Sequence, residues 1–137
     1  MIREIKCSDI SVINFFLKEL GSKEITASDL KNKLHQYYVY QLDGLVVGFI
    51  GYSIYYDRAE IDYLYVLNNY RFNNIGSRLL DYIINLVKGK CYNISLEVST
   101  DNIVAINLYK KKGFECVKII TNYYKEKNGF LMVKELD

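Results

Sequence analysis

The sequence of 137 residues contains no proline and no tryptophan, and it has only one histidine and three cysteines. A single histidine, His35, cannot by itself build a histidine triad or a metal cluster, and we read it as a residue at the end of a helix. The cysteines, Cys7, Cys91 and Cys116, lie far apart and form no C-x-x-C pair, which argues against a disulfide framework and a zinc site. We therefore expect a cytoplasmic protein without a bound metal, with Cys116 as a small core residue.

The sequence also lacks a strong charge of one sign and a long apolar run. It has 18 Lys and Arg against 16 Asp and Glu, and this net charge of +2 gives no reason to expect nucleic acid as a partner. The longest apolar stretch, residues 45–56, is too short and too interrupted to span a membrane, and residues 1–4 do not resemble a signal peptide. Half of the residues are hydrophobic, so residues 1–137 are expected to form a single domain with its own core.

The first half of the chain predicts helices followed by an antiparallel meander. Residues 2–5 form a short strand, and Ser8 caps a helix that ends at Gly21 and whose apolar stripe is Val12, Phe15, Phe16 and Leu20. A second helix is expected from Thr26 or Ser28 to His35. Strands follow at 37–42, 45–55 and 59–67, with Asp43-Gly44 as a hairpin turn, and the glycines at 48 and 51 suggest a bulge or a close backbone approach.

The second half changes to helical spacing and then back to strands. Apolar residues recur with helical period over 75–88, Gly89 ends this helix, and residues 92–98 alternate as a strand. A helix over 102–112 ends at Gly113, and strands at 114–120 and 130–136 pair antiparallel. Strand 59–67, helix 75–88 and strand 92–98 form a β-α-β unit, so these two strands are parallel. The fold class is α/β (α+β), a mixed and mostly antiparallel sheet with one central parallel pair, flanked by helices.

The turn between strand 59–67 and helix 75–88 is a candidate phosphate site. A helix start presents unpaired N–H groups and the positive end of the helix dipole, and both suit phosphate oxygens. Gly76 allows a close backbone approach, Asn74 can adopt a left-handed conformation, and Arg71 adds a charged donor. Read by itself, the turn fits an ordinary polar connection equally well. It is neither a G-x-G-x-x-G dinucleotide fingerprint nor a P-loop.

Two motifs in order resemble those of one enzyme family. The run Arg71-x-x-Asn74-x-Gly76-Ser77 looks like the R/Q-x-x-G-x-G/A motif of the GNAT superfamily, the Gcn5-related N-acetyltransferases. Downstream, Leu96-Glu97-Val98 and Asn102-x-x-Ala105-x-x-Leu108-Tyr109-x-x-x-Gly113-Phe114 resemble the second half of the GNAT acetyl-CoA site. With Asn122-Tyr123-Tyr124, the segments look like the RimI-type branch, which acetylates the N-terminal amine of a ribosomal protein. The resemblance covers residues 59–136, whereas residues 1–55 match only in the order of elements.

The resemblance implies acetyl-CoA as co-substrate and assigns residues to it. Its pyrophosphate would bind the backbone amides of Arg71, Phe72, Asn73, Asn74, Ile75, Gly76 and Ser77. Its pantetheine arm would pair with the backbone of Leu64, Tyr65 and Val66, where the two parallel strands separate. Asn102 and Tyr109 also match cofactor-contacting positions. Asn74 departs from the family pattern, because a glycine is expected there, and we expect binding to persist with reduced strength.

The resemblance also implies an acid–base pair, Glu97 and Tyr109. Formation of an amide from a thioester needs a neutral amine and a protonated leaving sulfur. Glu97 alternates with Leu96 and Val98 near the end of its strand, where partial desolvation would raise its pKa and make it a base. Tyr109 would donate a proton to the sulfur. A solvated strand-end Glu97 and a core Tyr109 are the structural alternatives, and Glu60 and Asp62 are alternative bases.

These observations predict an acetyl-CoA-dependent N-acetyltransferase with a protein N-terminal α-amine as the favoured acceptor. Two alternatives stay open at this point: acetylation of a small amine (a polyamine, an aminoglycoside or an amino acid), and a non-catalytic acetyl-CoA-binding domain. Tyr123 and Tyr124 are expected either to line the acceptor site or to pack within their hairpin. The expected partner is an amine acceptor rather than nucleic acid or a membrane, and the protein is expected to be a monomer or a homodimer.

Overall fold

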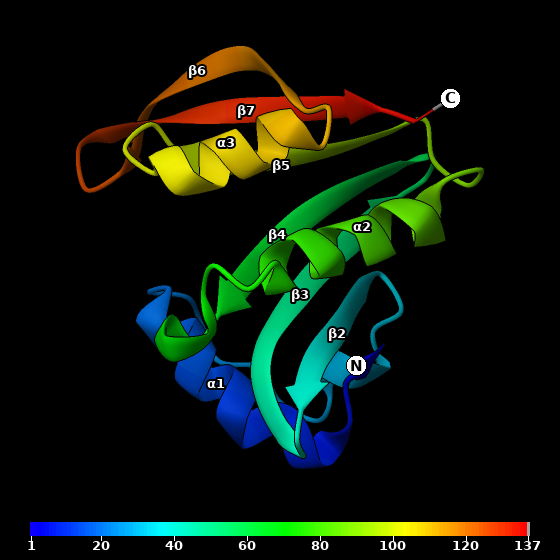
Figure 1. The fold of residues 1–137 in the computed structure, drawn as a ribbon. Helices are drawn as coiled ribbons and strands as arrows, with labels where there is room; N and C mark the ends of the chain where they lie inside the picture. Colours follow the sequence, from blue (N-terminus) through cyan, green and yellow to red (C-terminus); the bar gives the residue numbers. More distant parts are fainter. Residues whose placement is uncertain (137) are drawn as a thin grey trace. The chain divides into compact units, whose positions relative to one another are not determined.

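A computed structural model describes residues 1–136, which contain three α-helices and seven strands (Figure 1). In chain order they are β1 (Ile2–Glu4), α1 (Ile10–Glu19), β2 (His35–Leu42), β3 (Leu45–Tyr55), β4 (Arg58–Val66), α2 (Ile75–Val87), β5 (Asn93–Ser99), α3 (Ile103–Lys111), β6 (Glu115–Tyr124) and β7 (Lys127–Glu135). Short 3-10 turns, η1 (Cys7–Asp9), η2 (Asp29–Lys31) and η3 (Asn68–Tyr70), precede α1, β2 and α2.

The strands follow the order β1-β2-β3-β4-β5-β7-β6 in one hydrogen-bonded sheet. β1 pairs with β2, β2 with β3, β5 with β7, and β6 with β7, all antiparallel. β4 and β5 are parallel, and their ladder has three pairs, of which the last is Glu60–Ser95. The predicted mixed, mostly antiparallel sheet with one parallel β-α-β pair is therefore confirmed.

The residues form two compact units, which we describe separately. The first unit contains residues 1–53 and 62–83, and the second contains residues 54–61 and those from 84 onward. β3, β4 and α2 each continue from one unit into the other. The expectation of a single domain over 1–137 stays a prediction.

The core of the first unit forms where α1 packs on β2, β3 and β4. Phe16 of α1 stacks on Phe49 of β3 and on Tyr65 of β4, with ring centroids 6.1 and 4.7 Å apart. Ile13 and Leu17, which follow the helical period of Phe16, are fully buried beside it. Burial of such a face stabilises the helix more than its intrinsic propensity does.

Two predictions for this unit are wrong. The stripe on α1 is shifted, because Phe15 is 55% exposed while Ile13 and Leu17 are buried. The second predicted helix exists only as the turn η2, and His35 begins β2 instead of ending a helix. The ladder to β3 pairs His35 with Ser53, so strand pairing overrides the weak helical pattern of this segment.

The predictions for the hairpin turn and for three glycines are confirmed. Asp43 and Gly44 have φ angles of 51° and 81°, as a two-residue hairpin turn with both central residues left-handed requires. Gly48 makes a close backbone approach, because a Cβ there would lie 2.9 Å from the main-chain oxygen of Tyr65. Gly89 and Gly113 have φ angles of 85° and 95° and follow α2 and α3, which confirms both helix ends.

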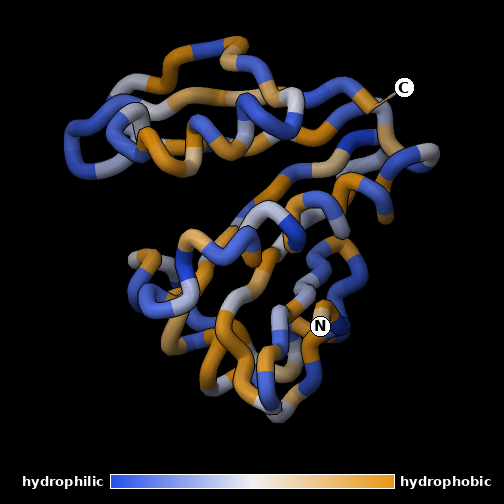
Figure 2. Tube along the Cα trace, in the orientation of Figure 1, coloured by the Kyte–Doolittle hydropathy of each residue, from blue (hydrophilic) through white to orange (hydrophobic). Residues whose placement is uncertain are grey.

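The second unit contains β5, β7 and β6 with α3 beside them (Figure 1). The tube of α3 changes from hydrophobic near its start to hydrophilic at its end (Figure 2), and its buried residues are Ile106 and Tyr109. Ile94 and Leu96 of β5 and Met132 of β7 are also buried in this unit. Cys116 is exposed, so the prediction of a core cysteine is wrong. Within residues 1–136, no helix has the length and apolar character needed to cross a membrane.

Candidate active site

The turn from β4 to α2, within the first unit, has an unusual backbone. Phe72 and Asn74 have φ angles of 65° and 63°, and α2 begins at Ile75. Asn74 thus takes the left-handed conformation that the sequence predicts for it, which Asn tolerates better than most other non-glycine residues. The left-handed Phe72 was not foreseen. A bulky residue is rarely found in that region, and Phe72 is also 90% exposed, so hydrophobic burial does not explain it.

The same turn presents a run of free main-chain donors. The amide of Arg71 bonds to the carbonyl of Asn68, and the amide of Arg78 bonds to the carbonyl of Asn74. Between them, the amides from Phe72 to Ser77 have no acceptor among residues 1–136. A run of free amides at the start of a helix suits the oxygens of a phosphate. The residues present therefore fit a pyrophosphate group.

Arg71 is fixed above β4 by two contacts. Its Nε donates a hydrogen bond to the carbonyl of Val66 at 2.8 Å, and its guanidinium lies 5.6 Å from the ring centre of Tyr65. The terminal nitrogens of Arg71 have no acceptor among residues 1–136. They remain available as charged donors next to the free amides.

Glu97 lies on β5, within the second unit, and its exposure agrees in part with the prediction. Leu96 and Val98 are buried while Glu97 is exposed, as the alternation of a strand requires. The expected partial desolvation of its carboxylate is absent from the protein alone. Bound ligands would have to exclude water from Glu97.

Tyr109 lies on α3 and is buried, with 8% of its surface exposed. Its ring contacts that of Phe114 at a centroid distance of 5.9 Å. Burial raises the pKa of Tyr109 to about 12, with a smaller contribution from the nearby Tyr123. Its phenol is therefore held in the protonated form that an acid requires.

Tyr123, on β6, connects the two predicted catalytic residues. Its hydroxyl donates to the main-chain carbonyl of Glu97 at 3.3 Å, and its pKa is raised by burial and by the charge of Glu97. It also interacts electrostatically with Tyr109. A bulge between Ile120 and Tyr124 turns it inward, and its ring lies over Gly129, where a Cβ would be 2.5 Å away. The sequence left the role of Tyr123 open, because a bulge has no clear local signal.

The remaining predicted cofactor residues have defined positions. Tyr65 is buried by α1, and Leu64 and Val66 are half-buried on the same strand. The side-chain oxygen of Asn102 accepts from the amide of Ala105 at 3.2 Å and so caps α3. This cap leaves the side-chain amide group of Asn102 as a donor for a ligand.

Comparison with known proteins identifies the family. Residues 8–114 match the acetyltransferase (GNAT) family. The chain belongs to this family. It is an acetyltransferase by that membership, and members of the family use acetyl-CoA.

Proteins that are similar in sequence to this GNAT protein have more specific names. It is 34% identical over 123 residues to an N-alpha-acetyltransferase of Sulfurisphaera tokodaii, covering 78% of this chain and 73% of that protein. It is 36% identical over 101 residues to a putative [ribosomal protein bS18]-alanine N-acetyltransferase of Bacillus subtilis, and this match covers 73% of this chain and 66% of that protein.

Solved structures give the same fold. Ard1 from Thermoplasma volcanium matches with a TM-score of 0.87 and 31% identity, covering 100% of this chain and 97% of that one. The ribosomal-protein-S18-alanine N-acetyltransferase from Escherichia coli matches with a TM-score of 0.88 and coverage of 100% and 94%. At 19% identity, the second likeness supports the fold alone.

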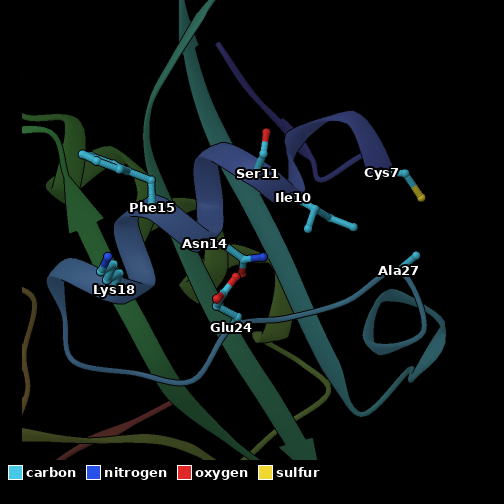
Figure 3. A pocket seen from close by; sticks show the side chains of 8 residues that line it. All are labelled: Cys7, Ile10, Ser11, Asn14, Phe15, Lys18, Glu24 and Ala27. Carbon is cyan, nitrogen blue, oxygen red and sulfur yellow. The ribbon is translucent and has the colours of Figure 1, made fainter.

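Figure 3 shows a pocket beside α1. Its lining residues lie between Cys7 and Ala27, far in the sequence from the predicted site residues. Its side chains come from η1, α1 and the loop that follows, and they include Phe15, Lys18 and Glu24. None of the predicted cofactor or catalytic residues lines it. We therefore assign it no part in acetyl transfer.

Proposed function

We propose that this GNAT protein transfers the acetyl group of acetyl-CoA to the N-terminal α-amine of a protein. The observation that carries the proposal is the run of free amides from Phe72 to Ser77 in a member of this family. The choice of acceptor is supported by the relatives named N-alpha-acetyltransferase and bS18-alanine N-acetyltransferase.

In this proposal, the free amides from Phe72 to Ser77 and the side chain of Arg71 hold the pyrophosphate, while the amide of Arg71 itself stays bonded to the carbonyl of Asn68. The backbone of Leu64, Tyr65 and Val66 pairs with the pantetheine arm. The early end of the β4–β5 ladder at Glu60–Ser95 supports this, because the strand continues to Val66 beyond its last pair with β5. Asn102 donates to the cofactor through its side-chain amide.

Glu97 and Tyr109 perform the proton transfers. Glu97 removes a proton from the acceptor ammonium group, directly or through a water, so that the amine nitrogen can attack the thioester carbonyl. The new C–N bond forms as the C–S bond breaks, and Tyr109 donates its phenolic proton to the departing sulfur. The surplus proton on the new amide nitrogen returns to the Tyr109 phenolate, directly or through a water, and Glu97 releases its proton to solvent. Tyr123 holds the main chain at Glu97 in place through its hydrogen bond.

The test is incubation of the protein with acetyl-CoA and two acceptor pools, followed by mass spectrometry. One pool contains peptides with free N-termini, and the other contains polyamines, aminoglycosides and amino acids. The proposal predicts acetylation at peptide α-amines, with loss of product in Glu97→Gln. Acetylation of the small amines alone would refute the acceptor assignment. Binding of acetyl-CoA without transfer to either pool would refute catalysis.

A further inference from the structure

Three polar side chains from β2, β3 and β4 form a hydrogen-bonded chain inside the first unit. The Nδ1 atom of His35 lies 2.6 Å from the hydroxyl of Ser53, its partner in the β2–β3 ladder. The hydroxyl of Ser53 donates a short hydrogen bond to Oδ2 of Asp62. His35 Nδ1 is also 3.9 Å from this carboxylate oxygen. The chain therefore ends on one oxygen of Asp62.

The direction of these bonds follows from the number of hydrogens. A serine hydroxyl has one hydrogen, and Ser53 gives it to Asp62, so Ser53 must accept from the Nδ1–H of His35. Ser53 is fully buried, so water does not compete for these bonds. The hydrogen bond from Ser53 and the nearby His35 favour the ionised form of Asp62, and the chain holds its side chain in one orientation.

The second carboxylate oxygen of Asp62, Oδ1, has no partner within residues 1–136. No Lys or Arg of that part of the chain pairs with Asp62, and its only basic neighbour is His35. The side chain of Asp62 is 25% exposed, so it is not sealed off from solvent. Burial raises the pKa of Asp62 more than Ser53 and His35 lower it, so its charge is incompletely compensated by the protein. An external cation would complete the compensation.

The location of Asp62 relates it to the acceptor, and this step rests on the proposed function. The phosphates bind at residues 71–77, after the end of β4, and the pantetheine arm pairs with residues 64–66. The arm must therefore run back along β4, from its C-terminal end toward its N-terminal residues. Asp62 precedes Leu64 by two residues, or about 7 Å along a strand. The thioester end of the arm, where the acceptor must arrive, thus points toward Asp62.

We propose that Asp62 selects acceptors that carry a positively charged side chain next to the amine to be acetylated. Its free oxygen accepts a charge-assisted hydrogen bond from the lysine or arginine of such an acceptor. His35 and Ser53 are positioning residues that hold the carboxylate. Glu97 keeps the role of base.

The first experiment compares two peptides that differ only at the second residue, Ala-Lys and Ala-Gln at the N-terminus. The wild-type protein is expected to show a kcat/KM ratio of about 10 or more in favour of Lys, as for one charge-assisted hydrogen bond. In Asp62→Asn the ratio falls to near one. Asp29→Asn is the matched control, because Asp29 also interacts with Tyr37 but bonds to Thr26, and it should keep the wild-type ratio.

The positioning role is tested with Ser53→Ala and Ser53→Thr. In Ser53→Ala, Asp62 loses a donor and should be protonated more easily. As the pH is lowered, the preference for the Lys peptide should therefore be lost at a higher pH than in wild type. Ser53→Thr keeps a hydroxyl and should restore the wild-type midpoint of this pH dependence. The other titratable groups that face Asp62 are His35, Tyr37 and Tyr63. A merely structural role would lower kcat/KM for both peptides and leave the ratio and its pH midpoint unchanged.

A binding experiment separates this proposal from the proposed function. N-terminally acetylated forms of the two peptides are titrated into the CoA-bound protein by calorimetry, which needs no turnover. If wild type binds the Lys form more tightly and Asp62→Asn does not, the role of Asp62 holds even where no acetyl transfer is seen. Equal preference in wild type and Asp62→Asn would overturn it. An equal loss of turnover on both peptides in Asp62→Asn, with the Lys preference kept, would instead indicate a base.

Discussion

Replacement of Tyr109 by Phe tests the predicted acid, because the structure separates the effect on chemistry from the effect on stability. The packing of Tyr109 on Phe114 is a contact between the two rings, which Phe in place of Tyr109 keeps. The change should therefore alter the free energy of unfolding at neutral pH by less than about 0.5 kcal/mol. Loss of a general acid is expected to lower kcat about 10²- to 10⁴-fold.

The same substitution has a second effect at alkaline pH. The pKa of Tyr109 is about 12 in the folded protein against 10.0 for the free side chain. A raised pKa means that the folded state keeps the proton longer, so stability is retained below pH 10 and lost as pH rises toward 12. Two pKa units correspond to about 2.7 kcal/mol. Because Phe cannot ionise, the free energy of unfolding of Tyr109→Phe should not show this decrease at alkaline pH.

The assays are steady-state kinetics with acetyl-CoA and a peptide acceptor, the Kd of acetyl-CoA, and urea unfolding between pH 7 and 11. Tyr92→Phe is the control, since Tyr92 is exposed and on no predicted site. A kcat within twofold of wild type, with cofactor binding intact, would refute Tyr109 as the acid. An unfolding free energy that falls as steeply with pH in Tyr109→Phe as in wild type would refute its raised pKa.

Four further changes have defined outcomes. Glu97→Gln should lower kcat by about 10²-fold or more while the Kd of acetyl-CoA stays within twofold, and an unchanged kcat would exclude Glu97 as base. Gly48→Ala should destabilise the protein by about 1–3 kcal/mol in urea unfolding, because its Cβ would lie 2.9 Å from a main-chain oxygen. Asn74→Gly should stabilise by about 0.5–1 kcal/mol by relieving a left-handed non-glycine residue, and calorimetry should show CoA binding at least as strong as in wild type. The hydrogen bond from Arg3 lowers the pKa of Asp9. The ion pair therefore stabilises the protein above about pH 4, and this stabilisation is lost as the pH falls further. In thermal unfolding, Arg3→Met should show a weaker decrease of stability with falling pH than wild type.

The elements that the sequence predicts well are those with local signals. The helix over 75–87, its stop at Gly89, and the hairpin at Asp43-Gly44 each depend on residues next to one another in the chain. Apolar periodicity and left-handed turn residues act over a few residues, so no distant partner has to be known. The parallel pairing of β4 and β5 followed from the same signals, since a strand, a helix and a strand in sequence give a parallel connection.

The errors fall where a distant partner decides. His35 lies in a strand because β3 pairs with it, and the weak helical pattern of its own segment does not win against a full ladder. Tyr123 lies beside Glu97 because a bulge in β6 and the absence of a side chain at Gly129 leave room for its ring. Neither feature has a pattern that a reading along the chain can recognise.

The sequence by itself determined the order of elements, the phosphate-binding turn as a candidate, and the acetyltransferase family, because each resides in short runs of adjacent residues. Only the tertiary structure decided which donors are free. The amides from Phe72 to Ser77 are unpaired because two left-handed residues turn the chain into α2. Asp62 has a held oxygen and a free one because three strands bring His35 and Ser53 to the same side of the carboxylate. Hydrogen-bond satisfaction depends on what folding brings together, and the order of residues along the chain does not contain it.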